Sequence, residues 1–419
     1  MTVSPKLELS ARPTEQPATT TPIPAASVAG GLALVVGVVL AAANLRPAVT
    51  SLAAVLSEVR DALGVSAAWT SAVTAIPTLC FGLVGMLAPW LSRRYGPRPV
   101  ITGALALIAL GLVGRVLDGP FVLVAGTFLA CAAIAVCNVL IPVVVKDSFP
   151  AGKVGAITGA YSAALSAGGA IAAAFTAPLE EVVGGWRSAV GMWALLAVLA
   201  LATWLLAGRS TAPARAVAVA EEAEEDAAPR RSLLRSPLAW AVTVFFGFQS
   251  LVAYTVMGWL PEILREMAGV TPTTAGQLLA IVMVLGVPVS MIVPPLAARA
   301  RSQSVWAMSM ALTGFAGFAG LLLAPTVATG LWILLIGIGM GVFPLALTLI
   351  TLRARTSQET AQLSAMAQSL GYLIAAAGPF AVGLLHGLTG GWELSLVLVL
   401  VVLAAQVVLG HVAGRPRYV

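Results

Sequence analysis

Apolar segments of 20 or more residues recur along the chain, separated by short loops that carry most of the charged residues. Such a segment is long enough to cross the hydrocarbon core of a bilayer as an α-helix. The ten-residue alternation of polar and apolar positions that marks a membrane β-barrel does not occur in the sequence. The pattern therefore predicts an all-α integral membrane protein built as a helical bundle.

Counting these segments predicts twelve membrane helices, six on each side of one long hydrophilic stretch. Residues 1–27 are rich in Pro, Thr, Ser and Ala and are expected to form a disordered tail, because they cannot build a packed core. We expect a first six-helix bundle over 28–208, a cytoplasmic linker over 209–236, a second bundle over 237–412 and a short tail over 413–419. The expected helices span residues 28–59, 67–92, 98–117, 120–147, 153–179, 186–207, 237–264, 273–297, 303–325, 330–353, 359–386 and 392–412.

The two halves of the chain match each other at an offset near 205 residues. Gly64-Val65 recurs as Gly269-Val270, and the loop Gly184-Gly185-Trp186 recurs as Gly390-Gly391-Trp392. The same loop motif in the same place of each half indicates an internal repeat. We therefore expect two similar bundles that face each other across a site at the membrane midplane.

The composition agrees with a membrane protein, since 59% of residues are hydrophobic, 10% are charged and the mean hydropathy is +0.98. The net charge of +6 does not indicate nucleic-acid binding, because the basic residues lie in loops next to the membrane helices. The three cysteines fall inside apolar segments and are expected to be small core residues.

The distribution of Lys and Arg predicts the topology, because cytoplasmic loops are enriched in these residues. With both termini in the cytoplasm, eighteen of the 23 basic residues fall on that side. The other side receives only Arg60, Arg115, Arg187 and Arg265, and Arg46 is left within the membrane. We expect a multi-pass protein of the bacterial inner membrane with both termini cytoplasmic.

Arg46 lies inside the first apolar segment, in Asn44-Leu45-Arg46-Pro47, about 16 residues in from Gly30. A guanidinium at the bilayer midplane costs between about 3 and about 15 kcal/mol, so it is rarely found there without a function. Pro47 has no amide hydrogen, which leaves the Ala43 carbonyl without its helical donor and predicts a bend beside the charge. We expect Arg46 to anchor a solute; the alternatives are snorkelling to an interface or neutralisation by a nearby carboxylate.

Few other polar residues are expected at the depth of Arg46, judged from a rise of about 1.5 Å per helical residue. Single Ser and Thr side chains commonly bond their own helix instead of a ligand, and Asn44 is as suited to a contact with a neighbouring helix as to a solute. Five candidates are expected to contribute to one central cavity, and one or two of these five are expected to be packing residues: Tyr161, Gln249, Tyr254, Gln368 and Tyr372. The candidate substrate-binding residues are Arg46, Asn44, Thr50, Asn138, Tyr161, Gln249, Tyr254, Gln368 and Tyr372.

No Asp or Glu is expected near the midplane. Glu58, on the same helix, is twelve residues from Arg46, or about 18 Å along a straight axis, and cannot pair with it. A cation without a counterion favours a negatively charged or electron-rich solute. The same distribution of acidic residues argues against a buried carboxylate as a proton carrier. His386 and His411 lie at helix ends and are expected to be structural or solvated. No metal site and no cofactor are predicted.

The loop 89–98 and its partner 294–299 resemble the signature between the second and third helices of the major facilitator superfamily. Arg93 stands where that family usually has an aspartate, which leaves the usual cytoplasmic charge latch without its acid. The residues assigned to this cytoplasmic gate motif are Arg94, Gly96, Arg98 and Arg299.

More specifically, the chain resembles the cyanate and nitroimidazole transporter family in segments spread over its whole length. These segments are 44–47, 138–142, 159–161, 249–254, 259–261, 343–345 and 366–372. The resemblance implies a twelve-helix major facilitator fold, with two six-helix bundles around a central cavity lined by helices one, four, seven and ten.

We therefore expect a monomeric secondary active transporter that moves a small anionic or polar planar solute, such as a cyanate-like anion or a nitroimidazole-like ring, by alternating access. The direction of transport and the coupling ion, a proton among the candidates, stay open. The alternative is a broad-range drug or metabolite exporter in which Arg46 orients a polar ring. A membrane enzyme would need catalytic groups converging at one depth, and a sensor would need a soluble signalling domain, so both are disfavoured.

Overall fold

The computed structural model describes residues 28–117, 119–149, 151–208, 233–355 and 357–419. The expected tail over 1–27 and most of the expected linker over 209–236 lie outside these residues. The described residues form helices joined by short turns, and they contain no strand.

Each half of the chain is built from long helices and from shorter helices that continue one another. The first half contains α1 (Val28–Ala43), α2 (Pro47–Ala54), α3 (Leu56–Leu63), α4 (Ala67–Leu83), the 3-10 helix η1 (Gly85–Leu87), α5 (Ala88–Tyr95), α6 (Pro97–Gly114), α7 (Pro120–Ser148), α8 (Ala151–Val183), α9 (Trp186–Gly191) and α10 (Trp193–Gly208). The second half contains the 3-10 helix η2 (Leu233–Arg235), α12 (Pro237–Ala268), α13 (Pro272–Arg299), α14 (Ser304–Leu323), α15 (Thr329–Gly339), α16 (Val342–Leu352), α17 (Ser357–Thr389) and α18 (Glu393–Ala413).

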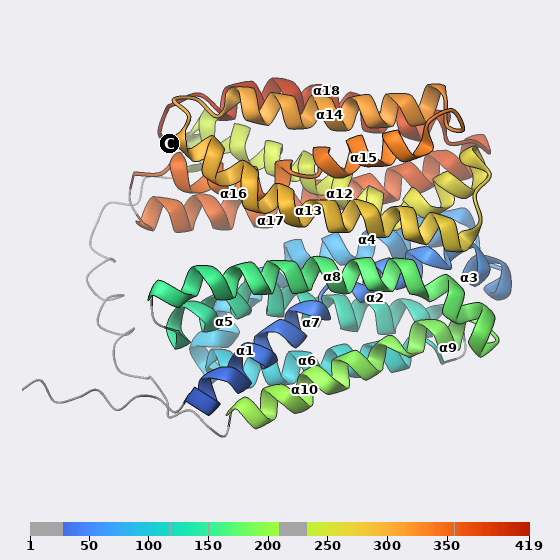
Figure 1. The fold of residues 1–419 in the computed structure, drawn as a ribbon, viewed down its shortest axis with the longest axis horizontal. Helices are drawn as coiled ribbons and strands as arrows, with labels where there is room; N and C mark the ends of the chain where they lie inside the picture. Colours follow the sequence, from blue (N-terminus) through green and yellow to red (C-terminus); the bar gives the residue numbers. More distant parts are fainter. Residues whose placement is uncertain (1–27, 118, 150, 209–232, 356) are drawn as a thin grey trace, which may run out of the picture.

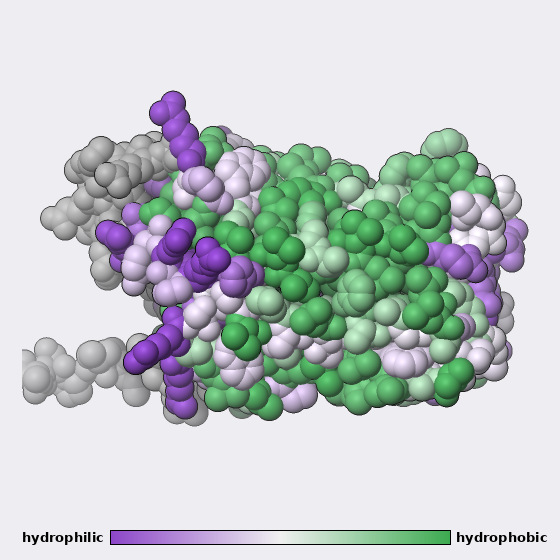
Figure 2. All heavy atoms as spheres, turned by 90° about the horizontal axis from the view of Figure 1, so that it is seen from above, coloured by the Kyte–Doolittle hydropathy of each residue, from purple (hydrophilic) through white to green (hydrophobic). Residues whose placement is uncertain are grey.

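Twelve helical spans in the described part of the chain are long and apolar enough to cross a membrane, as the sequence pattern predicted. Large apolar side chains cover the middle of the surface, and hydrophilic residues gather at its two ends (Figure 2). Phe121 is 84% exposed and Leu323 is 82% exposed, which would be unfavourable in water. The surface is that of a protein whose middle faces lipid.

The two halves lie side by side, with α1–α10 on one side and α12–α18 on the other (Figure 1). We name the two ends of the molecule the α3 face and the α5 face, after the helices that lie there. The halves meet where α4 packs against α17 and α8 packs against α13. One buried apolar cluster draws on both, since Leu56 and Ala173 of the first half pack with Val256 and Leu279 of the second.

The first span is not one helix over 28–59, as the sequence predicted, but three pieces. Residues 44–46 form a turn between α1 and α2, and Pro47 begins α2. This break lies at the bend expected from the missing amide hydrogen of proline. A second break follows at Val55, whose backbone leaves the helical region (φ −128°, ψ 26°).

Candidate functional site

Arg46 lies in the turn between α1 and α2, half-buried, with its side chain directed across to the second half. Its Nη1 is 3.4 Å from the sulfur of Met283 on α13 and 3.8 Å from the sulfur of Met257 on α12. A thioether is only a weak hydrogen-bond acceptor. Among the described residues no carboxylate pairs with Arg46, so most of the hydrogen-bonding capacity of its guanidinium is unused.

Two consecutive glycines of α8 pack against this turn. A Cβ atom on Gly168 would overlap the carbonyl oxygen of Ala43, the acceptor that Pro47 leaves without a helical donor. A Cβ atom on Gly169 would stand 3.0 Å from the Cβ and 3.2 Å from the Cδ of Arg46. These glycines therefore form a helix-packing face, and this face contacts the stem of Arg46.

Aromatic side chains from both halves gather at the same level of the molecule. Tyr254 of α12 and Tyr372 of α17 each lie with their ring centroids 5.5 Å from that of Phe81 on α4, and 6.3 Å from each other. Tyr161 of α8 packs against the same buried apolar cluster as Tyr254 and Tyr372, and all three phenol groups lie near Arg46. Four of the nine candidate residues thus lie together at the boundary between the halves.

Other candidate residues are engaged elsewhere. Asn44 is 1% exposed and donates to the carbonyls of Leu40 and, on α10, of Leu196, at 2.8 and 3.1 Å. Thr50 is fully buried and donates to the carbonyl of Arg46 at 3.3 Å. Both contacts are structural, which is the alternative that the sequence analysis left open for these residue types.

The two glutamines also make contacts within the second half. Gln249 is 3% exposed and, with Gln406, lines a cavity of about 10 Å³ inside this bundle, which has room for about one water molecule. Gln368 donates to Ser364 on its own helix at 2.8 Å. Asn138 is half-buried on α7 and has no hydrogen bond to a described residue.

Arg115 is a polar residue that the sequence analysis assigned to an outer loop and that the structure buries completely. It follows α6 and donates to the carbonyl of Ala48 at 2.6 Å and to the hydroxyl of Ser51 at 3.0 Å, both on α2. Burial lowers the pKa of Arg115 to about 10, so its guanidinium remains charged at neutral pH. Arg115 therefore holds the helix that follows the Arg46 turn.

The gate motif lies at the α5 face. Arg94 is exposed and donates to the hydroxyl of Tyr95 at 3.2 Å, and Arg98 donates to Ser148 at 3.4 Å. Gly96 joins α5 to α6 with a φ of +84°, which L-residues with a side chain rarely adopt. Arg299 is exposed in the last turn of α13.

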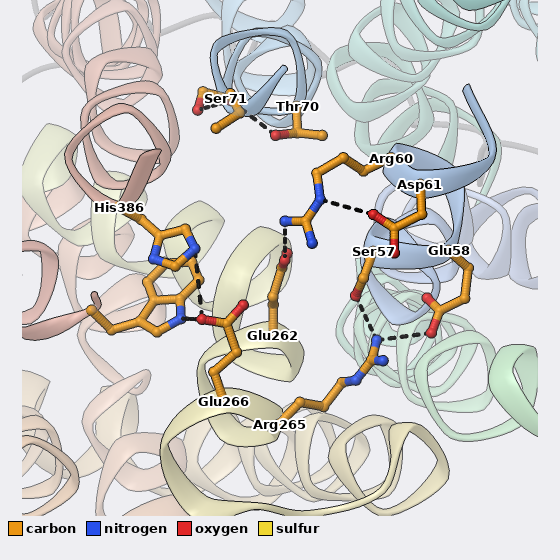
Figure 3. Close-up of polar contacts among 12 residues, drawn as sticks. Ser57, Glu58, Arg60, Asp61, Thr70, Ser71, Glu262, Arg265, Glu266 and His386 are labelled. Atoms are coloured by element: carbon orange, nitrogen blue, oxygen red, sulfur yellow. Dashed lines mark hydrogen bonds and ion pairs between the residues drawn. The ribbon is translucent and has the colours of Figure 1, made fainter. Parts of the chain in front are cut away.

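Charged groups that connect the halves lie at the α3 face (Figure 3). Arg60 of α3 pairs with Glu262 of α12 at 2.9 Å, and Arg265 of α12 pairs with Glu58 of α3 at 2.9 Å. Burial alone would lower the pKa of Arg60, but Glu262 and Asp61 beside it raise this pKa above the ordinary value.

Glu262 is 3% exposed. It lies at a helix end and away from the midplane, as the sequence analysis expected for the acidic residues, but its burial was not predicted. Position along a helix axis predicts depth but not burial, and Arg60 of the neighbouring half contacts Glu262 from the side. The offset of 205 residues that relates Arg60 to Arg265 is the sequence signal that could have found this cluster.

The family model described as Major Facilitator Superfamily matches residues 32–379. The chain belongs to the major facilitator superfamily. Its fold agrees, since it superimposes with a TM-score of 0.72 on a bacterial homologue of the human lysosomal transporter Spinster, over 91% of this chain and 95% of that one, at 15% sequence identity.

Relatives within the superfamily are similar over nearly the full length. The 2-nitroimidazole transporter of Escherichia coli strain K12 is 36% identical over 387 residues, covering 92% of this chain and 96% of the relative. The cyanate transport protein CynX of the same organism is 29% identical over 356 residues, covering 84% of this chain and 90% of the relative. The predicted family is confirmed. This member of the major facilitator superfamily is a multi-pass transporter of small molecules in the inner membrane, and not an enzyme.

Proposed function

We propose that this transporter moves a small anionic or polar planar solute across the inner membrane by secondary active transport, with Arg46 as the central anchor. The α3 face is taken as the outer side and both termini as cytoplasmic, in keeping with the basic residues of the loops.

The observation that carries this proposal is the position of Arg46. It stands in a break of the first span and projects to the other half. The hydrogen-bond acceptors that its guanidinium meets there, among the residues that the structure describes, are weak ones, the sulfurs of Met257 and Met283. A guanidinium with free donors is suited to a carboxylate-like or flat acceptor, which it binds through two parallel hydrogen bonds. A solute at this point would contact both halves, which alternating access requires.

The aromatic side chains around Arg46 support a small, flat solute. Phe81, Tyr254 and Tyr372 offer ring faces and edges from both halves, and the hydroxyl groups of Tyr254 and Tyr372 can add polar contacts. Cyanate is a small anion and 2-nitroimidazole is a polar planar ring, the solutes named for two relatives. The same aromatic group supports the second candidate, a broad-range exporter of polar ring compounds.

Thermal shift of the purified protein tests the proposal. We expect sodium cyanate or 2-nitroimidazole to raise the Tm of the parent protein, because a ligand that binds only the folded state stabilises it. Arg46→Ala should abolish this shift, while Arg187→Ala, which removes an arginine that lies over the Trp186 ring at the end of the same half, should retain it.

A panel of unrelated polar ring compounds separates the two candidates. Shifts by many such compounds would favour the broad-range exporter, and a response to cyanate or nitroimidazole alone would favour the narrower transporter. If cyanate or 2-nitroimidazole raised the Tm of Arg46→Ala as much as that of the parent, Arg46 would not be part of the solute site.

A further inference from the structure

The guanidinium of Arg46 reaches the second half through two methionines that the sequence analysis did not single out. Its Nη1 is 3.4 Å from the sulfur of Met283 on α13 and 3.8 Å from the sulfur of Met257 on α12. Both methionines are buried, at 3% and 2% exposure, in the apolar cluster that the two halves share. Met257 lies three residues after Tyr254 and therefore shares a face of α12 with it. The two thioethers thus belong to the surroundings of the proposed solute site.

The stem and the head of Arg46 are held in different ways. Gly169 of α8 confines the stem, because a Cβ atom on this glycine would stand 3.0 Å from the Cβ and 3.2 Å from the Cδ of Arg46. The head meets thioether sulfurs, which accept hydrogen bonds much more weakly than amide or carboxylate oxygens do. Packing therefore directs the guanidinium to the second half, and among the described residues no strong acceptor fixes it there.

The strength of an acceptor at this place decides how freely Arg46 can bind a solute. A hydrogen bond to a charged group shifts an equilibrium by roughly ten- to a hundredfold. If such a bond within the protein occupied the guanidinium in about 99 of 100 molecules, the apparent Kd of a solute would rise about a hundredfold. A thioether competes far less, so the solute is the stronger partner of the two.

We propose that Met257 and Met283 are positioning residues of the solute site. Their thioethers line the place that the Arg46 head reaches in the second half, and as weak acceptors they leave the guanidinium available to the solute. The inference rests on the solute contact of Arg46 proposed above, and it gives the second half a part in that contact. A stronger acceptor at either position would occupy the guanidinium in place of the solute.

Replacement of methionine by glutamine tests this, because the two side chains are similar in length and differ in acceptor strength. In Met283→Gln the new carbonyl oxygen stands one bond beyond the place of the sulfur, which brings it within about 2.7 to 3.2 Å of Arg46, the range of a hydrogen bond. Met283→Leu fills a similar volume and offers no acceptor. Met267→Gln is the matched control, since Met267 packs against the same apolar cluster but lies ten residues from Met257, or about 15 Å along α12.

Titration calorimetry with sodium cyanate and with 2-nitroimidazole measures the effect on the solute. Met283→Gln should bind both probes roughly ten- to a hundredfold more weakly than the parent, because its amide oxygen competes for Arg46. Met283→Leu should stay within about threefold of the parent, as a volume-conserving change without an acceptor. Met257→Gln should act in the same direction as Met283→Gln but less strongly, because its position is farther from Nη1. Met267→Gln should bind like the parent.

Thermal unfolding without solute tests the contact itself. Met283→Gln should raise the Tm more in the parent than in an Arg46→Ala background, because the new amide has a guanidinium to bind only in the parent. A methionine that merely fills the core would give the same change in Tm in both backgrounds.

Equal affinities of the parent and Met283→Gln would overturn the positioning role and leave the solute contact of Arg46 intact. An equal weakening by Met267→Gln would overturn it too, because a general loss of stability would then explain the result. If neither probe bound the parent, the proposed function would fail and the role of the methionines with it. The change in Tm would still show in that case whether position 283 faces Arg46.

Discussion

At the scale of single residues, the shape of the Arg46 guanidinium can be distinguished from its charge in its effect on solute binding. A guanidinium and an ammonium carry the same charge, but the guanidinium offers five donors in a planar fork, and the ammonium is a compact, strongly hydrated ion. The methionine sulfurs beside Arg46 do not saturate such a fork. The planar set of donors, and not only the positive charge, should therefore determine how tightly Arg46 binds a solute.

Arg46→Lys should not restore binding. A charge-assisted hydrogen bond is worth about 1.5 to 3 kcal/mol, so losing one should weaken the affinity for cyanate or 2-nitroimidazole by roughly ten- to a hundredfold. Titration calorimetry of the parent and the variant measures this ratio. An Arg46→Lys protein that binds as tightly as the parent would mean that Arg46 acts only as a point charge.

Arg46→Ala should leave the empty protein as stable as the parent, or more stable. The variant removes a half-buried charge that has no carboxylate partner among the described residues, so a desolvation cost disappears with it. The Tm without solute measures this effect. A large fall in this Tm would show that the arginine supports the fold instead of the solute.

At the scale of helices, the site depends on how closely α8 approaches the break in the first span. Gly168 lies against the carbonyl of Ala43 and Gly169 against the stem of Arg46. Arg115 holds α2 through hydrogen bonds to the carbonyl of Ala48 and the hydroxyl of Ser51. The position of Arg46 is thus set by the close approach of α8 and by the Arg115 side chain, and not by the turn alone.

Gly168→Ala should destabilise the protein and disturb the site, because the new methyl group would overlap backbone atoms that cannot rotate away. Overpacking of this kind costs about 1 to 3 kcal/mol. The matched variant is Gly159→Ala on the same helix, where a Cβ atom meets nothing within 4 Å. That variant should be neutral or gain up to about 1 kcal/mol from helix propensity. Thermal unfolding compares the two, and equal values of Tm would contradict the tight approach of α8.

At the scale of the whole molecule, the described residues form two halves that meet along α4, α17, α8 and α13, with cross-boundary ion pairs at the α3 face. The basic residues of the loops favour the other end, the α5 face, as the cytoplasmic side.

A membrane-impermeant maleimide tests the orientation on intact cells. In a background without cysteine, Ala62→Cys at the α3 face should be labelled from outside, because this position is exposed there. Arg301→Cys, exposed in the turn after α13, should be labelled only after the membrane is opened. The reverse pattern would invert the proposed topology.

The sequence determined those features that follow from local chemistry. Runs of apolar residues predicted twelve spans because a helix must satisfy its own backbone in lipid, and the structure has these spans within a few residues of the expected bounds. Pro47 predicted the bend beside Arg46 because proline lacks an amide hydrogen. The set of seven short segments that begins with the Arg46 motif also indicated the family, which the comparisons confirmed.

Only the tertiary structure decided which polar residues face one another. Tyr254 and Tyr372 reach the boundary between the halves, while Gln249 at a similar predicted depth turns into the second bundle and Asn44 turns to α10. Depth along a helix follows from position in the chain, but the direction of a side chain around the axis depends on which neighbour packs there. For the same reason Glu262, near a helix end in sequence, is covered by the opposite half and paired with Arg60.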